Sequence, residues 1–423
     1  MKTHAVCLAV LLAFLFVVQA ASAPFGYLSC SLRTSAGWHV LEIDVVAATV
    51  RTQASASASA KYDGIDAPPF FGDPSVIQRG ATRDIALLNG DGSVTQIVAA
   101  AAAHGTNADP CISRDGLYVA YVQRDASGYG EDILHYRREN GLFDSGIYTT
   151  DLADVTIDRP RFLPDGKSVL FAVEDHVTGS QALYRVGING GAAVKIAGLP
   201  PDPRQPACSP DGRFIACVAD YGGTPSLRLA APDGSNARRI DLQGMFALYP
   251  AFSPDGLYVA VCADNGIAIL DIATTSVVRM IELDYLEYAG LCWHLGSVEN
   301  LGITRKLKLK KGRLSLKALV AAPPALPSQG AVWIDRAVVT LDTPGLWVDK
   351  RGKKYLYKDP ALKRTAKLLP AKEIAVVNAK KLPFVPGEDY RLNEIIPVFM
   401  NVGRMTFHEQ LELNGKGIYK RAH

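Results

Sequence analysis

A serine and an aspartate stand two residues apart in the segment ACSPDGRFIACVAD, residues 207–220, with a cysteine on either side. A serine activated by a neighbouring group can act as a nucleophile, and two nearby cysteines can form a disulfide. Ser209, Asp211, Cys208 and Cys217 are therefore the first candidates for chemistry. The segment is either a reactive site or a piece of architecture, and its relatives within the chain distinguish the two.

Three other segments follow the same pattern: ADPCISRDGLYVAYVQRD, DRPRFLPDGKSVLFAVED and LYPAFSPDGLYVAVCADN. Each copy has a proline, an aspartate five positions later, a glycine directly after it and then a strand-like apolar run. The aspartate and glycine pairs are Asp115 and Gly116, Asp165 and Gly166, Asp211 and Gly212, and Asp255 and Gly256. Successive aspartates are 50, 46 and 44 residues apart, which is typical of four-stranded propeller blades.

The chemistry of the repeated core is that of a tight turn. Proline presets one dihedral angle, aspartate can accept hydrogen bonds from nearby backbone N–H groups, and glycine tolerates a positive φ. Leu163 replaces the serine in one copy, and Arg114 replaces the proline in another. A catalytic serine would need neither four copies nor a leucine in one of them, so we interpret these residues as hairpin turns.

A second hairpin pattern recurs later in the units, in RDIALLNGDGSVTQIV, YRVGINGGAAVKIAG and LRLAAPDGSNARRIDL. Apolar runs on both sides of a glycine turn predict a third and a fourth strand, which complete one blade. The SPDG hairpin followed by one such as APDGSNARRI resembles the WD-like propeller repeat of the TolB family of periplasmic proteins. The resemblance covers about residues 80–295 and implies a TolB-like propeller and a periplasmic location. We expect a departure from TolB, which carries a small α/β domain before its propeller, because here the predicted propeller follows the predicted signal peptide.

The predicted fold class is all-β, with a six-bladed β-propeller at residues 24–300, and its last blade looks divided. LEYAGLCWHLGS resembles an innermost strand, while YLSCSLR and WHVLEIDVVAATVR near the N-terminus would supply the remaining strands. Cys30 and Cys292 would both lie at this seam, and a disulfide between them is one interpretation. The alternative is that all six cysteines after the signal peptide are small buried hydrophobic residues.

Residues 301–423 form a second predicted domain, a basic β-sandwich, because strand candidates alternate with short glycine turns. The pattern of a strand followed by Gly-Lys-Lys-Tyr resembles Ig-like accessory domains of bacterial secreted proteins. Residues 301–423 carry 24 Lys and Arg against 10 Asp and Glu. Lys306, Lys308 and Lys310 would share one face of a strand, and Lys311 adds to this basic stripe. The stripe would attract an anionic envelope surface or the acidic propeller, or it would only solvate a strand and discourage edge pairing.

The N-terminus has the pattern of a bacterial secretory signal peptide at residues 1–23. Lys2 precedes an apolar run from Ala5 to Val18, and the small residues 21–23 fit a cleavage site. We therefore expect a periplasmic or extracellular protein with no transmembrane segment after cleavage, because no other stretch is long and apolar enough to span a bilayer.

The mouth of the propeller channel is the predicted ligand-binding site. The residue before each repeat proline would lie at the start of an innermost strand, and Tyr288 would take the corresponding place in the divided blade. These candidates are Asp109, Arg159, Gln205, Tyr249 and Tyr288. The alternative is that they only cap the strand starts.

No nucleophile motif of the G-x-S-x-G type, no HExxH and no clustered metal ligands occur in the sequence. We therefore predict no catalytic residue, no metal and no cofactor. The expected function is a monomeric, non-catalytic scaffold that binds a protein or cell-envelope component, and not nucleic acid. The alternative is a polysaccharide lyase or hydrolase whose site gathers residues from several blades in the channel. A purely structural envelope component is a third possibility.

Overall fold

The computed structural model describes residues 24, 26–56, 61–69, 75–79, 83–89, 93–99, 105–113, 116, 118–125, 131–138, 144–150, 154–164, 166–210, 212–221, 223–254, 256–294, 302–310, 313–320, 330–334, 337–340, 347–349, 355–359, 364–369, 374–380, 395–402, 405–413 and 418–421. The predicted signal peptide lies outside the described residues, as do the four turn residues Asp115, Asp165, Asp211 and Asp255. Within the described ranges, no helix has the length and apolar character needed to cross a membrane.

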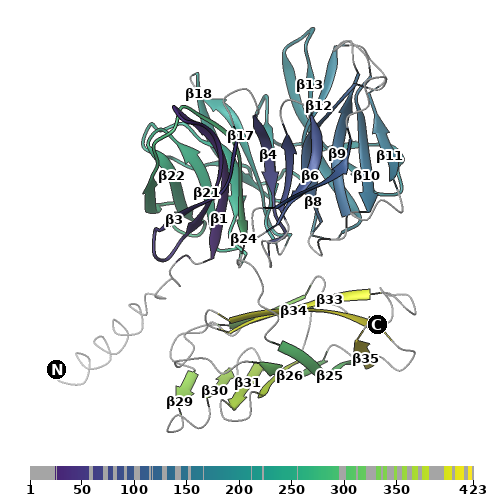
Figure 1. Ribbon diagram of the computed structural model, residues 1–423, viewed down its shortest axis with the longest axis vertical. Helices are drawn as coiled ribbons and strands as arrows, with labels where there is room; N and C mark the ends of the chain where they lie inside the picture. Colours follow the sequence, from purple (N-terminus) through teal and green to yellow (C-terminus); the bar gives the residue numbers. More distant parts are fainter. Residues whose placement is uncertain are drawn as a thin grey trace, which may run out of the picture. The chain divides into compact units, whose positions relative to one another are not determined.

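The chain divides into two compact units, one spanning Pro24–Glu299 and one that contains the C-terminal residues from Asn300 onwards. The first unit is a six-bladed β-propeller of four-stranded antiparallel sheets, as predicted (Figure 1). Five blades are built from consecutive strands. The first has β4 (Tyr62–Asp66), β5 (Ser75–Arg79), β6 (Asp84–Leu88) and β7 (Val94–Val98). The second has β8 (Thr106–Ile112), β9 (Tyr118–Arg124), β10 (Ile133–Arg138) and β11 (Asp144–Thr149).

The next three blades repeat this order. The third has β12 (Val155–Phe162), β13 (Ser168–Asp175), β14 (Ser180–Gly187) and β15 (Val194–Lys195). The fourth has β16 (Arg204–Cys208), β17 (Ile215–Tyr221), β18 (Thr224–Ala230) and β19 (Arg238–Arg239). The fifth has β20 (Leu248–Phe252), β21 (Tyr258–Ala263), β22 (Gly266–Asp271) and β23 (Val277–Glu282).

The sixth blade joins the two ends of the unit, as the sequence predicts. Its strand order is β24 (Glu287–His294), β1 (Tyr27–Thr34), β2 (Gly37–Asp44) and β3 (Val50–Ala56). Figure 1 shows the purple N-terminal strand β1 beside the green strand β24. The first strands of the blades touch in the circular order β24, β4, β8, β12, β16, β20 and back to β24. The ring is therefore closed by hydrogen bonds between β1 and β24, the first and the last strand of the unit in sequence.

The cores of the blades explain why the strands read as apolar runs. β21 and β22 are buried along their whole lengths, because each has a neighbouring strand on both sides and a neighbouring blade on both faces. Val259 and Val261 pack in one cluster, whereas Ala260 and Cys262 pack in another, so alternate residues of one strand stabilise two different blade interfaces. Burial of this surface is the main stabilising contribution.

The SPDG-type segments form the first hairpin of the second, third, fourth and fifth blades. Gly116, Gly166, Gly212 and Gly256 have φ values of 72°, 61°, 72° and 70°. In the opening segment the N–H of Gly212 donates to the carbonyl oxygen of Ser209 over 2.9 Å, and the hydroxyl of Ser209 accepts from the N–H of Phe214 over 2.9 Å. Ser209 is buried in this turn and is a structural residue rather than a nucleophile.

The interpretation of Cys30 and Cys292 as a disulfide is wrong in this structure, where both are free thiols. Cys30 pairs with Leu291 across the two strands, and Ser29 pairs with Cys292. Because successive side chains point to opposite faces of a strand, the two sulfurs lie on opposite sides of the sheet. Cys30 accordingly packs in one core cluster and Cys292 in another.

The second unit is an antiparallel sheet of 11 strands in the order β28-β27-β33-β34-β35-β25-β26-β32-β31-β30-β29. Its strands are β25 (Gly302–Lys310), β26 (Arg313–Val320), β27 (Gly330–Ile334), β28 (Ala337–Thr340), β29 (Trp347–Asp349), β30 (Tyr355–Asp359), β31 (Arg364–Leu369), β32 (Ile374–Lys380), β33 (Ile395–Val402), β34 (Met405–Leu413) and β35 (Ile418–Arg421). The all-β class is confirmed for the part of the chain that is described. The division of this unit into the two sheets of a sandwich stays a prediction.

Candidate functional site at the channel mouth

Each innermost strand of the five consecutive blades is interrupted by a β-bulge near its start. The pairing register shifts between Asp63 and Ile65 in β4, and corresponding shifts occur in β8, β12, β16 and β20. In those last four strands the bulge contains the repeat proline and the residue before it. Proline has no N–H to give to the ladder, so pairing is broken there and one extra residue is accommodated.

The residue before the proline has the same unusual backbone in all four strands. The φ values are 48° for Asp109, 50° for Arg159, 51° for Gln205 and 52° for Tyr249. In β4 a glycine, Gly64, takes this position with a φ of 70°. The left-handed region is unfavourable for residues with a side chain, and such residues cluster at functional sites. Four of the five predicted site residues, all except Tyr288, therefore lie at bulges within the innermost strands and not simply at the strand starts.

Three of the five predicted residues line one cavity of about 400 Å³ at this end of the channel. Asp109, Arg159 and Gln205 contribute to its wall, whereas Tyr249 and Tyr288 are outside its lining. The remaining charged and amide groups of the wall are Asp63, Gln78, Arg83, Arg124, Asp158, Glu174, Gln181 and Arg204. The cavity is thus polar and carries both signs of charge, with walls from four neighbouring blades.

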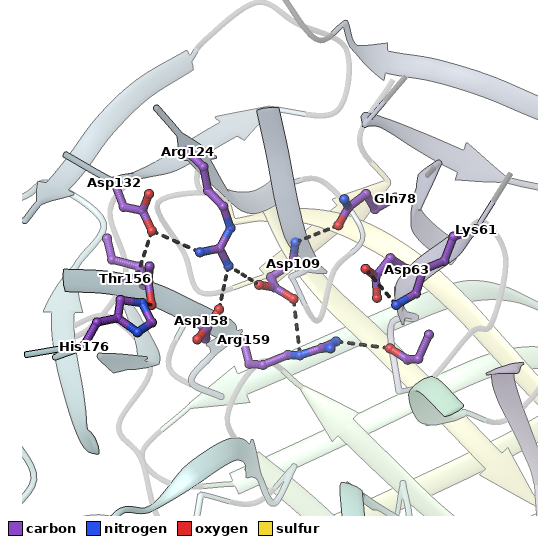
Figure 2. A network of polar contacts seen from close by, with 12 residues as sticks. Lys61, Asp63, Gln78, Asp109, Arg124, Asp132, Thr156, Asp158, Arg159 and His176 are labelled. Atoms are coloured by element: carbon purple, nitrogen blue, oxygen red, sulfur yellow. Dashed lines mark hydrogen bonds and ion pairs between the residues drawn. The ribbon is translucent and has the colours of Figure 1, made fainter. Parts of the chain in front are cut away.

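Arg159 is the centre of a network that connects all five predicted residues. Its Nε lies 3.2 Å from Asp109 Oδ1, and its Cζ lies 4.8 Å from the centre of the Tyr249 ring. The Tyr249 hydroxyl donates to the carbonyl oxygen of Tyr288 over 3.3 Å, and the Tyr249 N–H donates to Gln205 Oε1 over 2.8 Å. Figure 2 shows the guanidinium of Arg159 reaching from Asp109 on one side to a backbone carbonyl on the other.

Glutamine side chains satisfy two of the bulge N–H groups that the ladder leaves unpaired. Gln78 Oε1 accepts from the N–H of Asp109 over 3.2 Å, as Gln205 Oε1 does from Tyr249 in another blade. In both cases the glutamine belongs to the blade before the one it serves. An unpaired N–H inside the channel would be costly, so these amides stabilise the strained bulges.

Arg124 is a second arginine at the mouth, and the sequence analysis did not single it out. Its guanidinium lies 3.0 Å from Asp109, 3.3 Å from Asp132 and 2.5 Å from Asp158. Figure 2 shows the three aspartates around this guanidinium. Asp132 also accepts the backbone N–H of Ile157 over 2.9 Å. One cation thereby joins three carboxylates from the second and third blades.

The repeat contains a signal for this position. A charged residue stands nine positions after each repeat aspartate, at or near the end of the second strand: Arg124, Glu174, Asp220 and Asp264. Arg124 and Glu174 line the cavity, and Asp220 forms an ion pair of 2.7 Å with Arg204, which also lines it. Comparing polar residues at equal repeat positions would have found this second ring of the mouth.

The carboxyl groups around Arg124 differ in their pKa values. Burial opposes ionisation of Asp109, but Arg159 and Arg124 outweigh it and hold its pKa below the ordinary value. Burial and the negative charge of Asp109 raise the pKa of Asp158, and burial raises the pKa of Asp132. The first proton taken up by this cluster therefore goes to Asp158 or Asp132, while Asp109 stays ionised against its two arginines.

A second, smaller cavity of about 100 Å³ lies further along the innermost strands. Its apolar walls include Phe162, Phe252 and Trp293, and its charged residues are Asp66 and Arg161. The channel therefore changes from polar to apolar between its two levels. Among the residues that the structure describes, no group of three or more His, Cys, Asp or Glu side chains is placed to hold a metal ion.

Comparisons with known proteins agree with this fold. The structure of TolB from Acinetobacter baumannii aligns with a TM-score of 0.51 and 18% identity, covering 63% of this chain and 66% of TolB. A putative TolB from Agrobacterium tumefaciens aligns with a TM-score of 0.48 and 17% identity, covering 62% of this chain and 91% of that one. The TolB-like propeller expected from the repeats is therefore confirmed as the fold of the first unit.

Sequence comparison adds a short match to a curated protein, and no family model matches the chain. The uncharacterized peptidase YuxL of Bacillus subtilis is 28% identical over 123 residues, which is 28% of this chain and 18% of the peptidase. The sequence match spans less than a fifth of the peptidase. The structural alignment spans just under two thirds of the Acinetobacter TolB. These likenesses define a class of fold, a six-bladed propeller of the TolB type, and leave the function to the site.

Proposed function

We propose that this chain is an exported, monomeric propeller scaffold without catalytic activity, which binds a protein or another cell-envelope component at the mouth of its channel. The observation that carries the proposal is the convergence of Asp109, Arg159 and Gln205 on the polar cavity of about 400 Å³. All three have the left-handed backbone that ordinary strands avoid. The signal-peptide pattern of residues 1–23 supports export, and we expect the C-terminal unit to be a β-sandwich.

The charges of the cavity indicate what kind of ligand surface would fit. Arg124 and Arg159 form ion pairs with aspartates of the protein. Their charges are therefore largely compensated, and their main role is to fix the geometry of the site. Arg204 and Glu174 are more accessible, with 28% and 30% of their side chains exposed. A polar segment that carries both an acidic and a basic group would find partners on the third and fourth blades.

The experiment that tests the proposal is capture from an envelope extract with the full-length chain as bait. The double variant Arg204→Ala with Glu174→Ala removes one accessible cation and one accessible anion of the mouth. Its matched control is Arg239→Ala with Asp241→Ala, an exposed pair 3.5 Å apart at the outer edge of the fourth blade. Both variants lose one cation and one anion, so the net charge of the bait is unchanged.

We expect the mouth variant to lose at least about tenfold of the captured partner, because accessible charges at a recognition site are each worth more than a surface pair. The control should capture as much as the unmodified chain. Equal capture by the mouth variant and the unmodified chain would contradict the proposal. Loss of capture with both variants would show that the outer edge of the fourth blade also takes part in binding. That result would contradict the proposal as well.

A further inference from the structure

The strand register of the basic C-terminal unit places many of its positive residues on one face of the sheet. β25 places Lys306, Lys308 and Lys310 on one side of the strand after its bulge. The pairing register sets Lys306 opposite Lys317 and Lys310 opposite Arg313 of β26. Directly opposite residues of an antiparallel pair share a face, so these five cations are neighbours on two strands.

The next three strands extend the same face. Arg313 pairs with Lys380 of β32, and Lys317 pairs with Val376, which in turn pairs with Lys367 of β31. Lys358 of β30 is added by its pairing with Thr365 of β31. Neighbouring strands lie about 4.8 Å apart and alternate residues about 7 Å apart, so the cations spread over a surface about 20 Å wide.

No acidic residue shares this face on the five strands. β25, β26, β31 and β32 contain no Asp or Glu, and Asp359 of β30 pairs with Arg364 on the opposite side of the sheet. On the described residues of these five strands the face therefore carries positive charge only. A surface with one sign of charge attracts a ligand of the other sign.

The described side chains show that this face is open to solvent. One row across the five strands runs from Lys308 through Ser315, Asn378 and Thr365 to Lys358. Ser315, Asn378, Thr365 and Lys358 are all exposed. Leu316, which points to the other side, is only 1% exposed, so the apolar core of the unit lies on that side.

We propose that this basic face, defined by Lys306, Lys308, Lys310, Arg313, Lys317, Lys358, Lys367 and Lys380, docks the protein on a membrane surface rich in anionic lipids. The cations are distributed in two dimensions over a sheet, which matches a plane of headgroups rather than a single strand of polymer. Tyr355 and Tyr357 fall on the opposite side by register, so the face offers no aromatic platform for nucleic-acid bases. The inference is independent of the ligand at the channel mouth.

Co-sedimentation of the full-length protein with lipid vesicles tests this inference. One set of vesicles contains phosphatidylethanolamine and phosphatidylglycerol, and the other contains phosphatidylcholine alone. The double variant Lys308→Glu with Lys358→Glu reverses the sign of charge at the two ends of this row. Its matched control, Lys167→Glu with Lys195→Glu, makes the same change in charge at two exposed propeller positions.

We expect binding to the anionic vesicles only, weakened by salt, and at least about tenfold weaker for the Lys308 and Lys358 variant than for its control. Equal binding of both variants, or equal binding to phosphatidylcholine, would overturn the proposal. Tighter binding to duplex DNA than to the vesicles, or no vesicle binding at all, would overturn it as well. Should the variant fail to fold, the salt dependence and lipid preference of the unmodified chain decide between the same outcomes.

Discussion

Arg159 of β12 donates a hydrogen bond of 3.2 Å to the carbonyl oxygen of Ala289 in β24, on the opposite side of the propeller channel. Since β12 and β24 are three positions apart in a ring of six innermost strands, one side chain spans the whole channel. It also holds Asp109 and lies over the ring of Tyr249. The channel mouth and the closing seam of the propeller are therefore coupled through a single guanidinium.

Replacing Arg159 by alanine should lower the free energy of unfolding by about 3 kcal/mol, because it leaves the buried Asp109 carboxylate without one of its two cations. Urea unfolding of the propeller measures this change. Arg239→Ala, which removes an exposed arginine of the fourth blade, should change the stability by less than about 0.5 kcal/mol. Similar small effects of both variants would show that the channel-spanning contacts do not stabilise the ring.

Removing Arg124 should have an effect that depends on pH. Arg124→Met would leave Asp109, Asp132 and Asp158 as neighbouring carboxylates with one cation fewer. The loss of stability relative to the unmodified chain should be about 3 kcal/mol at pH 7 and smaller at pH 5. Burial already raises the pKa values of Asp132 and Asp158, so these groups take up protons first. A loss that grows as the pH falls would contradict this assignment.

The seam itself should weaken in mild acid. His294 of β24 is fully buried with its Nε2 2.8 Å from the Ser29 hydroxyl of β1, and burial lowers its pKa from 6.5 to about 4. The folded protein keeps the ring neutral, whereas the unfolded chain protonates it below about pH 6.5. The neutral His294 ring therefore contributes about 3 kcal/mol to the free energy of unfolding above pH 6.5. This contribution declines as the pH falls from 6.5 towards 4.

Urea unfolding at pH 7.5 and pH 4.5 measures this dependence for the unmodified chain and for His294→Gln. The glutamine variant should be less stable at pH 7.5 and should lose less stability between the two pH values. An identical pH dependence in both proteins would mean that His294 does not control the acid sensitivity of the seam.

A close backbone approach between the last and first blades gives another prediction. A Cβ atom at Gly290 would lie 2.8 Å from the backbone nitrogen of Ile65, so alanine there would push β24 away from β4. We expect Gly290→Ala to cost about 2 kcal/mol of stability. Gly166→Ala is a useful comparison, because its Cβ would have no atom within 4 Å and its cost would come from the positive φ alone. A smaller cost at Gly290 than at Gly166 would contradict the close packing of the two strands.

The sequence was sufficient for the propeller because blade formation depends on local chemistry that is repeated. Gly116 and its three equivalents mark the first hairpins of four blades at a nearly regular spacing. Tyr288 stands in its segment where Tyr249 stands in its repeat, and this correspondence predicts the divided blade. The Cys30 pairing failed because it depends on the register of β1 on β24, where one residue decides which face a sulfur occupies. No local pattern encodes that register.

The candidate site was predicted in part for a similar reason. Asp109, Arg159, Gln205 and Tyr249 share a repeat position beside a proline, so the repeat alone identifies them. Their backbone conformation and their contacts across the channel depend on the closed ring. Arg124 also has a shared repeat position, which holds a charged residue in all four copies. Its ion pairs with carboxylates of two blades, however, have no signature in a single repeat.

The most direct measurement of the central claim is photo-crosslinking at the channel mouth. A photoreactive amino acid placed at Arg204, in the wall of the cavity, should form a covalent adduct with the bound partner in the envelope of the producing cell. The same group at Arg239, at the outer edge of the same blade, should give no such adduct. An adduct at Arg239 and none at Arg204 would contradict a binding site at the mouth of the channel.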